Sequence, residues 1–279
     1  MLVTLTSDRD ILTLQGWQTD YGSEEGWWVE EGGLSGLWGG VGMRATETDN
    51  PSGNGQLWPG CVRAQARSLT VVLVHRADTS TLAELEARDR IADMVGRDLT
   101  VTVETDGTRR SIAGLIVAQP EFTHVDHQTC RAGFVIRCPD PLWRGLPVSV
   151  GGRWAETSGG GLQYPLYGDT GTLLYSIAAP LNRVTVPNVG RQDSWPVLHT
   201  DGASEWWRFT CAGRSVEMRH PTGACVVDCR AGTVTAGGVD QTSWLSRDDF
   251  FQIPPGGAEV EFWASGGVGF SVEVAPAWL

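Results

Sequence analysis

Four residues in the second half of the chain carry groups that could bind a metal ion. The thiols of Cys211, Cys225 and Cys229 and the imidazole of His220 are side chains that zinc prefers. Cys225 and Cys229, however, lie in a run expected to be a strand, which would separate their sulfurs by about 13 Å. One tetrahedral ion cannot span that distance. The sequence therefore favours free thiols buried in a core, and leaves a zinc site or a disulfide as alternatives. The same interpretation extends to Cys61, Cys130 and Cys138.

Adjacent acids offer a second possible chemistry. Glu24-Glu25, Glu30-Glu31 and Asp248-Asp249 could supply the two carboxylates that hydrolyse a glycosidic bond. Adjacent acids are far more common on solvated surfaces, however. Solvated surface is therefore the favoured interpretation of the three pairs, and a glycoside hydrolase remains the alternative.

The chain lacks the residues of several other catalytic classes. All 21 basic residues are arginines, which excludes a lysine-containing phosphate-binding loop, a Schiff-base lysine and a Ser-Lys dyad. The run from Gly32 to Gly36 has Ser35 but Leu37 two positions after the serine. A nucleophile elbow needs glycine there. We expect no enzymatic activity, no catalytic residues and no cofactor.

Tryptophans in the second half could bind a sugar or fill a core. Trp206-Trp207, Trp244 and Trp263 are the residues concerned, and tryptophan is common both in cores and at interfaces. Neighbouring residues on a strand face opposite ways, so one of Trp206 and Trp207 should point outward. Trp207 and Trp244 are the candidates for contact with a carbohydrate or a partner.

The elements that would hold these residues are mostly strands. The 36 glycines and 14 prolines among 279 residues indicate many turns between short strands. In the first half, residues 2–14 form a hairpin around Ser7–Asp10, residues 69–75 and 132–138 are buried strands, and residues 99–117 form a hairpin around Asp106-Gly107. One helix is expected from Thr81 to Gly96, with Leu82, Leu85, Ala92 and Val95 at helical spacing.

Residues 17–58 are rich in tryptophan and glycine and have weak periodicity. Such a stretch is expected to be a long functional or subunit-contacting loop, ordered in part by its neighbours. After it, the boundary between two domains is expected at Asp140-Pro141-Leu142-Trp143, because proline ends a strand there. Asp140, Pro141 and Trp143 are thus the predicted inter-domain junction.

The predicted organisation is a mainly β chain of two β-sandwich-type domains, the first with one α-helix. Residues 1–143 form the first domain, 144–161 a linker that includes Ser158–Gly161, and 162–279 the second domain. The net charge of −12 argues against nucleic-acid or anionic membrane binding, since such binding depends on basic residues. No stretch has the roughly 20 apolar residues of a membrane span, and we expect synthesis in the cytoplasm.

Short motifs in a fixed order are similar to those of one known family. They are Ile11–Gly16, the loop ending near Asn54-Gly55, Arg67–Val71, the single helix, Asp140–Trp143, Asn188-Val189-Gly190, Trp195–Leu198, Asp228, Ile253–Gly256 and Val260–Phe262. In this order the chain resembles the distal tail proteins (Dit) of long-tailed, non-contractile bacteriophages, in particular those of actinobacteriophages.

The resemblance implies a fold, a role and partners. The second domain would be a galectin-like sandwich, and the first would form a homohexameric ring at the distal end of the tail tube. The ring would join the tail tube protein to the tail-tip hub protein, leave a lumen for DNA, and contact the tape measure protein. An acidic chain suits such a lumen, because DNA should slide rather than stick. A carbohydrate-binding adhesion protein that recognises a host cell-wall glycan is the alternative. Either role would place the protein in the virion, at the tail tip.

Overall fold

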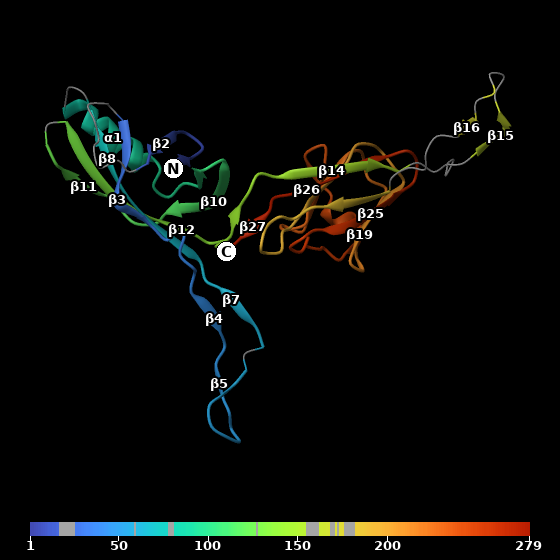
Figure 1. Cartoon of the computed structure of the whole chain (residues 1–279), viewed down its shortest axis with the longest axis horizontal. Coiled ribbons are helices and arrows are strands. Elements are labelled where there is room, and N and C mark those ends of the chain that lie inside the picture. Colours follow the sequence, from blue (N-terminus) through green and yellow to red (C-terminus); the bar gives the residue numbers. More distant parts are fainter. Residues whose placement is uncertain are drawn as a thin grey trace. The chain divides into compact units, whose positions relative to one another are not determined.

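The computed structural model divides into two compact units, Met1–Gly145 with Leu279, and Leu146–Trp278 (Figure 1). It describes residues 1–16, 26–58, 60–77, 81–126, 128–154, 162–167, 171, 173–175 and 182–279. Glu24-Glu25 and Ser158–Gly161 lie outside the described residues. Within the described part, strands predominate and no helix is long and apolar enough to cross a membrane. The prediction of a mainly β fold is confirmed.

The first unit is built around one sheet. Its strands, in spatial order, are β11 (Glu121–His124), β12 (Thr129–Cys138), β8 (Arg67–Arg76), β3 (Gly26–Ser35), β2 (Ile11–Gln15), β1 (Leu2–Thr6), β9 (Leu99–Thr105), β10 (Thr108–Ile116) and β13 (Trp143–Arg144). An additional pairing of β10 with β12 joins Ile116 to Ile136. This pairing closes the sheet on itself and removes two long open edges, so the unit has one closed sheet rather than two facing sheets.

Both predicted hairpins of the first unit are confirmed. β1 and β2 pair around Ser7–Asp10, where the Ser7 hydroxyl donates to the Asp10 carbonyl at 3.1 Å. β9 and β10 pair around Asp106-Gly107, and both turn residues have positive φ, at 49° and 76°. This conformation matches the two-residue turns that suit the twist of a hairpin.

The single helix forms, but it buries a different face from the one predicted. α1 spans Thr81–Asp93, and Ala87, Ile91 and Met94 are buried. Leu85, Ala92 and Val95, which the sequence placed at helical spacing, are exposed. The buried residues lie four and three positions apart, which places them on one face of the helix and its C-terminal end.

The region expected to be a long loop contains a central strand. β3 pairs with β8 over most of its length and buries Trp27, Trp28 and Val29. The pairing register shifts between Val29 and Leu34. This irregularity, at Glu30–Gly33, breaks the alternation of apolar residues that would have revealed the strand.

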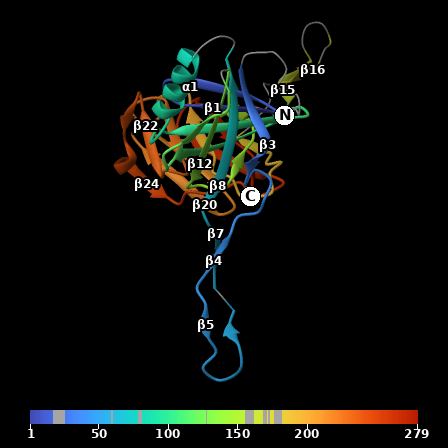
Figure 2. The ribbon, with the colours of Figure 1, turned by 90° about the vertical axis from the view of Figure 1, so that its left-hand side faces the viewer.

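The rest of that region forms an arm that leaves the sheet between β3 and β8. It comprises two short antiparallel ribbons, β4 (Met43–Ala45) with β7 (Val62–Ala64), and β5 (Thr48–Asp49) with β6 (Gln56–Leu57). Both ribbon views show these strands running away from the sheet (Figures 1 and 2). We call residues 37–64 the arm.

The second unit is a sandwich of two sheets. One has the order β14 (Val148–Arg153), β26 (Gly269–Val274), β18 (Val197–Thr200), β21 (Cys225–Asp228), β22 (Thr233–Ala236) and β23 (Val239–Asp240). The other has the order β17 (Arg183–Val186), β25 (Ala258–Ala264), β19 (Trp206–Cys211), β20 (Arg214–Arg219) and β24 (Leu245–Asp248). The remaining elements are β15 (Leu162–Tyr167), paired with β16 (Leu173–Tyr175), the 3₁₀-helix η1 (Thr242–Trp244) and β27 (Ala277–Trp278).

Strand β14 corrects the predicted linker. Residues 148–153, placed by the sequence in a linker, pair with β26 from Val148↔Val274 to Arg153↔Gly269. Glycine at 151 and 152 hides this strand in the sequence, since glycine is rare in strand interiors. At Gly151 a Cβ would lie 2.5 Å from the Phe270 carbonyl oxygen, so the close approach of β26 requires glycine.

The two sheets enclose one apolar core. Buried side chains from both sheets form it, including Leu198, Val227 and Val272 from one and Trp207, Phe209 and Phe262 from the other. Phe209 contacts Phe262 at a centroid distance of 4.7 Å, and Phe262 stacks on Phe270 at 4.6 Å. Such aromatic contacts stabilise the core beyond the effect of the apolar area that they bury.

Asn188 organises the loop before β18. Its side-chain nitrogen donates to the carbonyls of Gln192 and Ile253 at 3.0 and 2.9 Å, and its oxygen accepts from the Gly190 amide at 3.0 Å. At Gly190 a Cβ would lie 2.4 Å from the Ala277 backbone. The Asn-Val-Gly motif is therefore explained by a buried amide and a close backbone approach.

Candidate functional site

The arm exposes apolar side chains that no other described part of the chain covers. Trp58 is 93% exposed, and Met43, Leu57 and Val62 are each about half exposed. Isolated apolar residues are ordinary on protein surfaces, but a cluster on one projecting ribbon indicates a contact with another molecule.

Polar interactions hold the end of the arm in a defined shape. The Asn50 amide donates to the Gly55 carbonyl at 2.9 Å, and the Asn50 side-chain oxygen accepts from the Ser52 amide at 3.0 Å. The Gln56 side chain donates to Glu47 at 3.2 Å across the ribbon. These are turn-forming bonds that asparagine makes readily. The arm is thus a specified structure and not an irregular loop.

Arg67 anchors the base of the arm. Its side chain is buried, with Nε donating to the Pro141 carbonyl at 3.1 Å and Nη1 donating to the carbonyls of Gly36 and Gly39 at 2.7 and 2.8 Å. Burial lowers the pKa of this guanidinium below its ordinary value. A buried guanidinium is tolerated here because three of its N–H groups donate to backbone carbonyls.

Arg67 has no predicted role of its own, although it belongs to the Arg67–Val71 motif. Its side chain points inward from β8, on the same face of the strand as the buried Leu69 and Val71. An arginine at an inward strand position is the signal that could have identified it. Arg67 ties together the start of the arm, the start of β8 and the predicted junction.

The junction residues form a compact turn within the first unit. The Asp140 carboxylate accepts from the Leu142 amide at 3.2 Å and pairs with Arg144 at 3.1 Å. Pro141 contributes the carbonyl that Arg67 binds. Trp143 is buried. The structure therefore brings Asp140, Pro141 and Trp143 together, as their sequence positions require.

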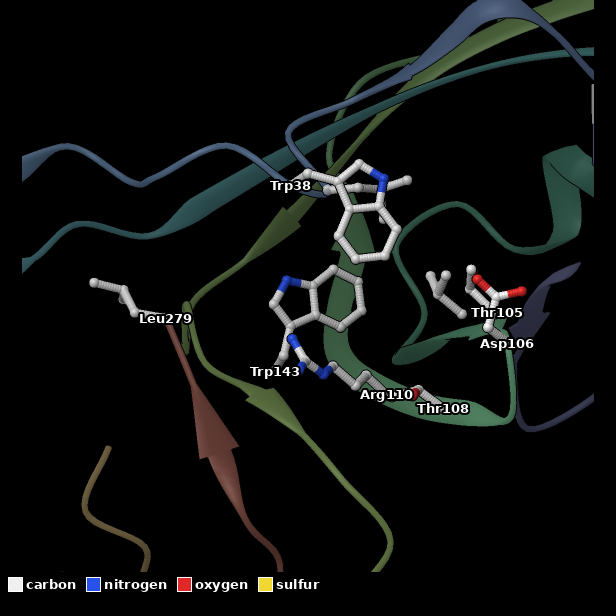
Figure 3. A pocket seen from close by; sticks show the side chains of 9 residues that line it. Trp38, Thr105, Asp106, Thr108, Arg110, Trp143 and Leu279 are labelled. Atoms are coloured by element: carbon white, nitrogen blue, oxygen red, sulfur yellow. The ribbon is translucent and has the colours of Figure 1, made fainter. Parts of the chain in front are cut away.

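A cavity of about 340 Å³ lies beside Trp143. The base of the arm lines it with Leu37 and Trp38, the β9–β10 hairpin with Val103, Thr105, Asp106, Thr108 and Arg110, and the chain end with Leu279. Figure 3 shows the indole of Trp38 directly over that of Trp143. This volume is at the lower end of the range for ligand pockets, about 300–1,000 Å³.

Two polar atoms of this cavity wall are buried without a hydrogen-bond partner among the described residues. They are Nε1 of Trp143 and Oγ1 of Thr105. A buried polar group without a partner costs about 1–3 kcal/mol. Both atoms are enclosed by protein and have almost no accessible surface, so neither faces the open volume of the cavity.

The candidate tryptophans of the second unit lie in different environments. Trp207 is completely buried in the core, so its proposed contact with a glycan or partner is wrong. Its neighbour Trp206 points outward, because successive strand residues alternate. Trp244, in η1, is 49% exposed and remains accessible.

Another tryptophan, Trp263, begins a polar row on the outer face of this sheet. Trp263 lies opposite Arg208, Arg208 opposite Glu217, and Glu217 opposite Arg247. Glu217 accepts from Arg208 Nε at 2.7 Å and from the Ser246 hydroxyl at 3.0 Å. Burial alone would raise the pKa of Glu217, but these hydrogen bonds outweigh it and lower that pKa.

The other chemical candidates are not assembled into sites. Cys211, Cys225 and Cys229 are buried free thiols in the sandwich core, whereas His220 is exposed. No cluster of His, Cys, Asp and Glu among the described residues could hold a metal ion. Glu30 pairs with Arg131 at 2.6 Å, and Asp249 with Arg247 at 3.8 Å. Neither pair of described acids converges on a cleft.

Comparison with known proteins identifies the fold. The chain matches the crystal structure of the Dit protein of phage SPP1 over 100% of both chains, with a TM-score of 0.65 and 14% identity. The chain has the fold of a phage distal tail protein. The phage P2 baseplate in its activated conformation, with calcium and with strontium, is also similar, with TM-scores of 0.52 and 0.51, 9% identity, and 98% of this chain and 97% of the other covered. No protein-family model and no curated protein sequence matches the chain.

The distal tail fold accounts for both units of the chain. SPP1 Dit is described as a paradigm of the hub adsorption apparatus in phages that infect Gram-positive bacteria. The similarity extends across both units without a large unmatched segment. The arm, the Arg67 anchor and the junction turn therefore belong to a chain that has this fold over its whole aligned length.

Proposed function

We propose that the chain is a structural protein of a phage tail tip. In this proposal, six copies form a ring at the distal end of the tail tube. The observation that carries the proposal is the full-length structural match to SPP1 Dit, a protein of a hub adsorption apparatus. Because the match covers both chains completely, it relates whole architectures and not a single common domain.

The surface of the first unit supports self-association. A head-to-tail interface joins two different patches of the same chain, and such interfaces close into rings. The exposed apolar arm is one such patch. In the proposed ring the first units make the contacts between copies, while the second units are stable sandwiches with their own core.

The ring would connect the tail tube protein above to the hub protein below, and it would contact the tape measure protein. DNA would pass through its lumen. The net charge of −12 supports this role, because an acidic wall repels phosphates and prevents DNA from adhering.

Mass measurement and microscopy test the proposal. Full-length protein should elute at about six times the chain mass of 30.1 kDa, and negative-stain images should show rings with an open centre. In virions, antibody against the chain should label the tail end distal to the capsid. A protein that stays monomeric at all concentrations and is absent from purified virions would contradict the proposal.

A second candidate function is recognition of a host cell-wall glycan by the second unit. The observation that favours it is the outward row from Trp263 to Arg208, with Trp206 on the same face. Aromatic and charged polar groups side by side could hold a sugar ring by stacking and hydrogen bonding. Binding of the full chain to purified cell wall, lost in Trp263→Ala and retained in Trp244→Ala, would support it. Equal binding by both variants would count against this face.

A further inference from the structure

We propose that the tip of the arm, residues 50–55, is a site of self-modification. Asn54 is converted there to aspartate and isoaspartate through a cyclic imide formed with Gly55. The reaction consumes water and releases ammonia. Its chemistry needs only the arm itself and does not depend on ring formation.

The reaction joins a backbone nitrogen to a side-chain carbon. The Gly55 nitrogen attacks Cγ of Asn54, the bond between Cγ and Nδ2 breaks, and ammonia leaves with the proton of the Gly55 amide. Water then opens the imide at either of its carbonyls. One opening gives aspartate, and the other gives isoaspartate, in which the chain continues through the side-chain carbon. Each product has a carboxylate where the natural side chain has a neutral amide.

The attacking nitrogen of Gly55 is accessible. Asn54 and Gly55 are both exposed, and they lie in the turn between β5 and β6, outside the paired strands. The turn uses the Gly55 carbonyl, which accepts from the Asn50 amide at 2.9 Å. Within the described part of the chain, the Gly55 amide itself donates to no backbone carbonyl. The nitrogen is therefore not held away from the neighbouring side chain.

The space around Gly55 is open. A Cβ at this position would meet no atom within 4 Å, and glycine has no side chain to hinder the nitrogen. The φ of Gly55 is 83°, a conformation that favours glycine. The shape of the turn therefore specifies the residue that makes the attack easiest.

The other three asparagines of the chain lack this combination. Asn50 precedes Pro51, whose nitrogen has no proton. The Asn188 side chain is buried, and its amide nitrogen donates to two backbone carbonyls. Asn182 precedes Arg183, which has a bulky side chain and is paired in β17. The arm tip is therefore the favoured site among the asparagines of the sequence.

The products change both the charge and the shape of the arm tip. Residues 47–58 contain two acids, Glu47 and Asp49, and no basic residue, so a new carboxylate adds to a local negative charge. Isoaspartate also lengthens the backbone of the turn that is closed by the bond from Asn50 to Gly55. We expect the pairing of β5 with β6 to weaken, because it consists of only two residue pairs.

Mass spectrometry of the full chain, incubated in ¹⁸O-labelled water, tests the site. Cleavage at Arg44 and Arg63 releases one peptide that contains both Asn50 and Asn54. We expect ¹⁸O at position 54 and at none of the other asparagines, with both aspartate and isoaspartate present. The folded chain should react no more than severalfold more slowly than the chain unfolded in urea, because the turn leaves the reacting groups open.

Asn54→Gln is the matched control. It keeps the amide and adds a methylene, so the imide would need a larger ring that forms far more slowly. This variant should gain no label during the same incubation. Labelling of the natural chain at position 54 in urea but not in the folded state would overturn the inference. Earlier labelling at another asparagine of the folded chain would also overturn it.

Hydrogen exchange of the amides in residues 47–57 measures the effect on the arm. Exchange should become faster after incubation of the natural chain and stay unchanged in Asn54→Gln. Asn54→Asp supplies the charge without lengthening the backbone, so it should show a smaller increase. Unchanged exchange in a fully labelled natural chain would overturn the predicted weakening of the β5–β6 pairing.

Discussion

The two units of this chain differ in where their large apolar side chains lie, in a core or in solvent. In the second unit, two sheets face each other and bury a continuous core that includes Trp207, Phe209 and Phe262. In the first unit, a closed sheet buries its own residues, but an arm leaves it with Trp58 and four other large apolar side chains in solvent. The second unit buries most of its large apolar residues in its own core, whereas the first leaves a cluster of them in solvent, which is typical of a contact surface.

The largest effect should come from breaking the core of the second unit. Phe209→Ala removes a fully buried ring that contacts Phe262 and Phe270. We expect a loss of about 3–5 kcal/mol in the unfolding free energy of that unit. Calorimetry of the full chain should show one transition lowered and the first unit's transition unmoved. Val189→Ala, at an exposed position, is the control and should change stability by less than about 0.5 kcal/mol.

A smaller loss is expected at the anchor of the arm. Arg67→Met leaves the carbonyls of Gly36, Gly39 and Pro141 without their donor. We expect the first unit to lose about 3 kcal/mol, since each orphaned group costs on the order of 1 kcal/mol or more. Thermal unfolding monitored by circular dichroism measures the loss. Arg63→Met, on the exposed part of the arm, is the matched control; equal destabilisation by both variants would show that Arg67 has no anchoring role.

The polar outer face of the second unit should make a pH-dependent contribution of about 1 kcal/mol to the free energy of unfolding. Hydrogen bonds from Arg208 and Ser246 lower the pKa of Glu217 despite its burial. The ionised Glu217 carboxylate therefore stabilises the fold above its unfolded-state pKa. This stabilisation is lost as the pH falls through the folded-state pKa of Glu217. Glu217→Gln should be less stable than the natural chain at pH 7, and the difference should vanish in acid. Denaturant titrations at pH 7 and at about pH 3 measure it; a difference that grows in acid would contradict the assignment.

Thiol labelling compares the two units without changing their stability. All six cysteines are free, and Cys61 on the arm is the exposed one. Burial raises the pKa of Cys138 to about 11 and that of Cys229 to about 12, which suppresses the reactive thiolate. One thiol per chain should react quickly and the other five only on unfolding. In assembled rings, Cys61 should react more slowly if the arm is covered; an unchanged rate would place the arm outside the interface.

The sequence predicts the elements whose signals are local. The Asp106-Gly107 turn and the Ser7–Asp10 turn were identified correctly, because their residue types specify the chain reversal. The outward direction of one of Trp206 and Trp207 followed from strand alternation, and Trp206 is the outward residue. The alternation could not decide which of the two faced the core, and the choice of Trp207 as a contact residue was wrong.

Features that depend on distant partners escaped prediction. β3 was hidden because the irregularity at Glu30–Gly33 interrupts its pattern, and its pairing with β8 comes from far along the chain. Arg67 binds Pro141, 74 residues away, and no local pattern encodes that bond. The cavity beside Trp143 likewise combines the arm, a hairpin and the chain end, so only the folded structure brings its walls together.

The Arg67 anchor also gives the molecule a mechanical property. One guanidinium is hydrogen-bonded both to Gly39 at the start of the arm and to Pro141 in the last turn before the second unit begins. Hydrogen bonds lose most of their strength when they are stretched or bent beyond narrow limits. A force on the arm therefore reaches Pro141 through this side chain as well as through the backbone pairing of Arg67 with Cys138 in β8 and β12. If the side-chain hydrogen bonds broke, the paired strands would remain as the connection between the arm and the turn.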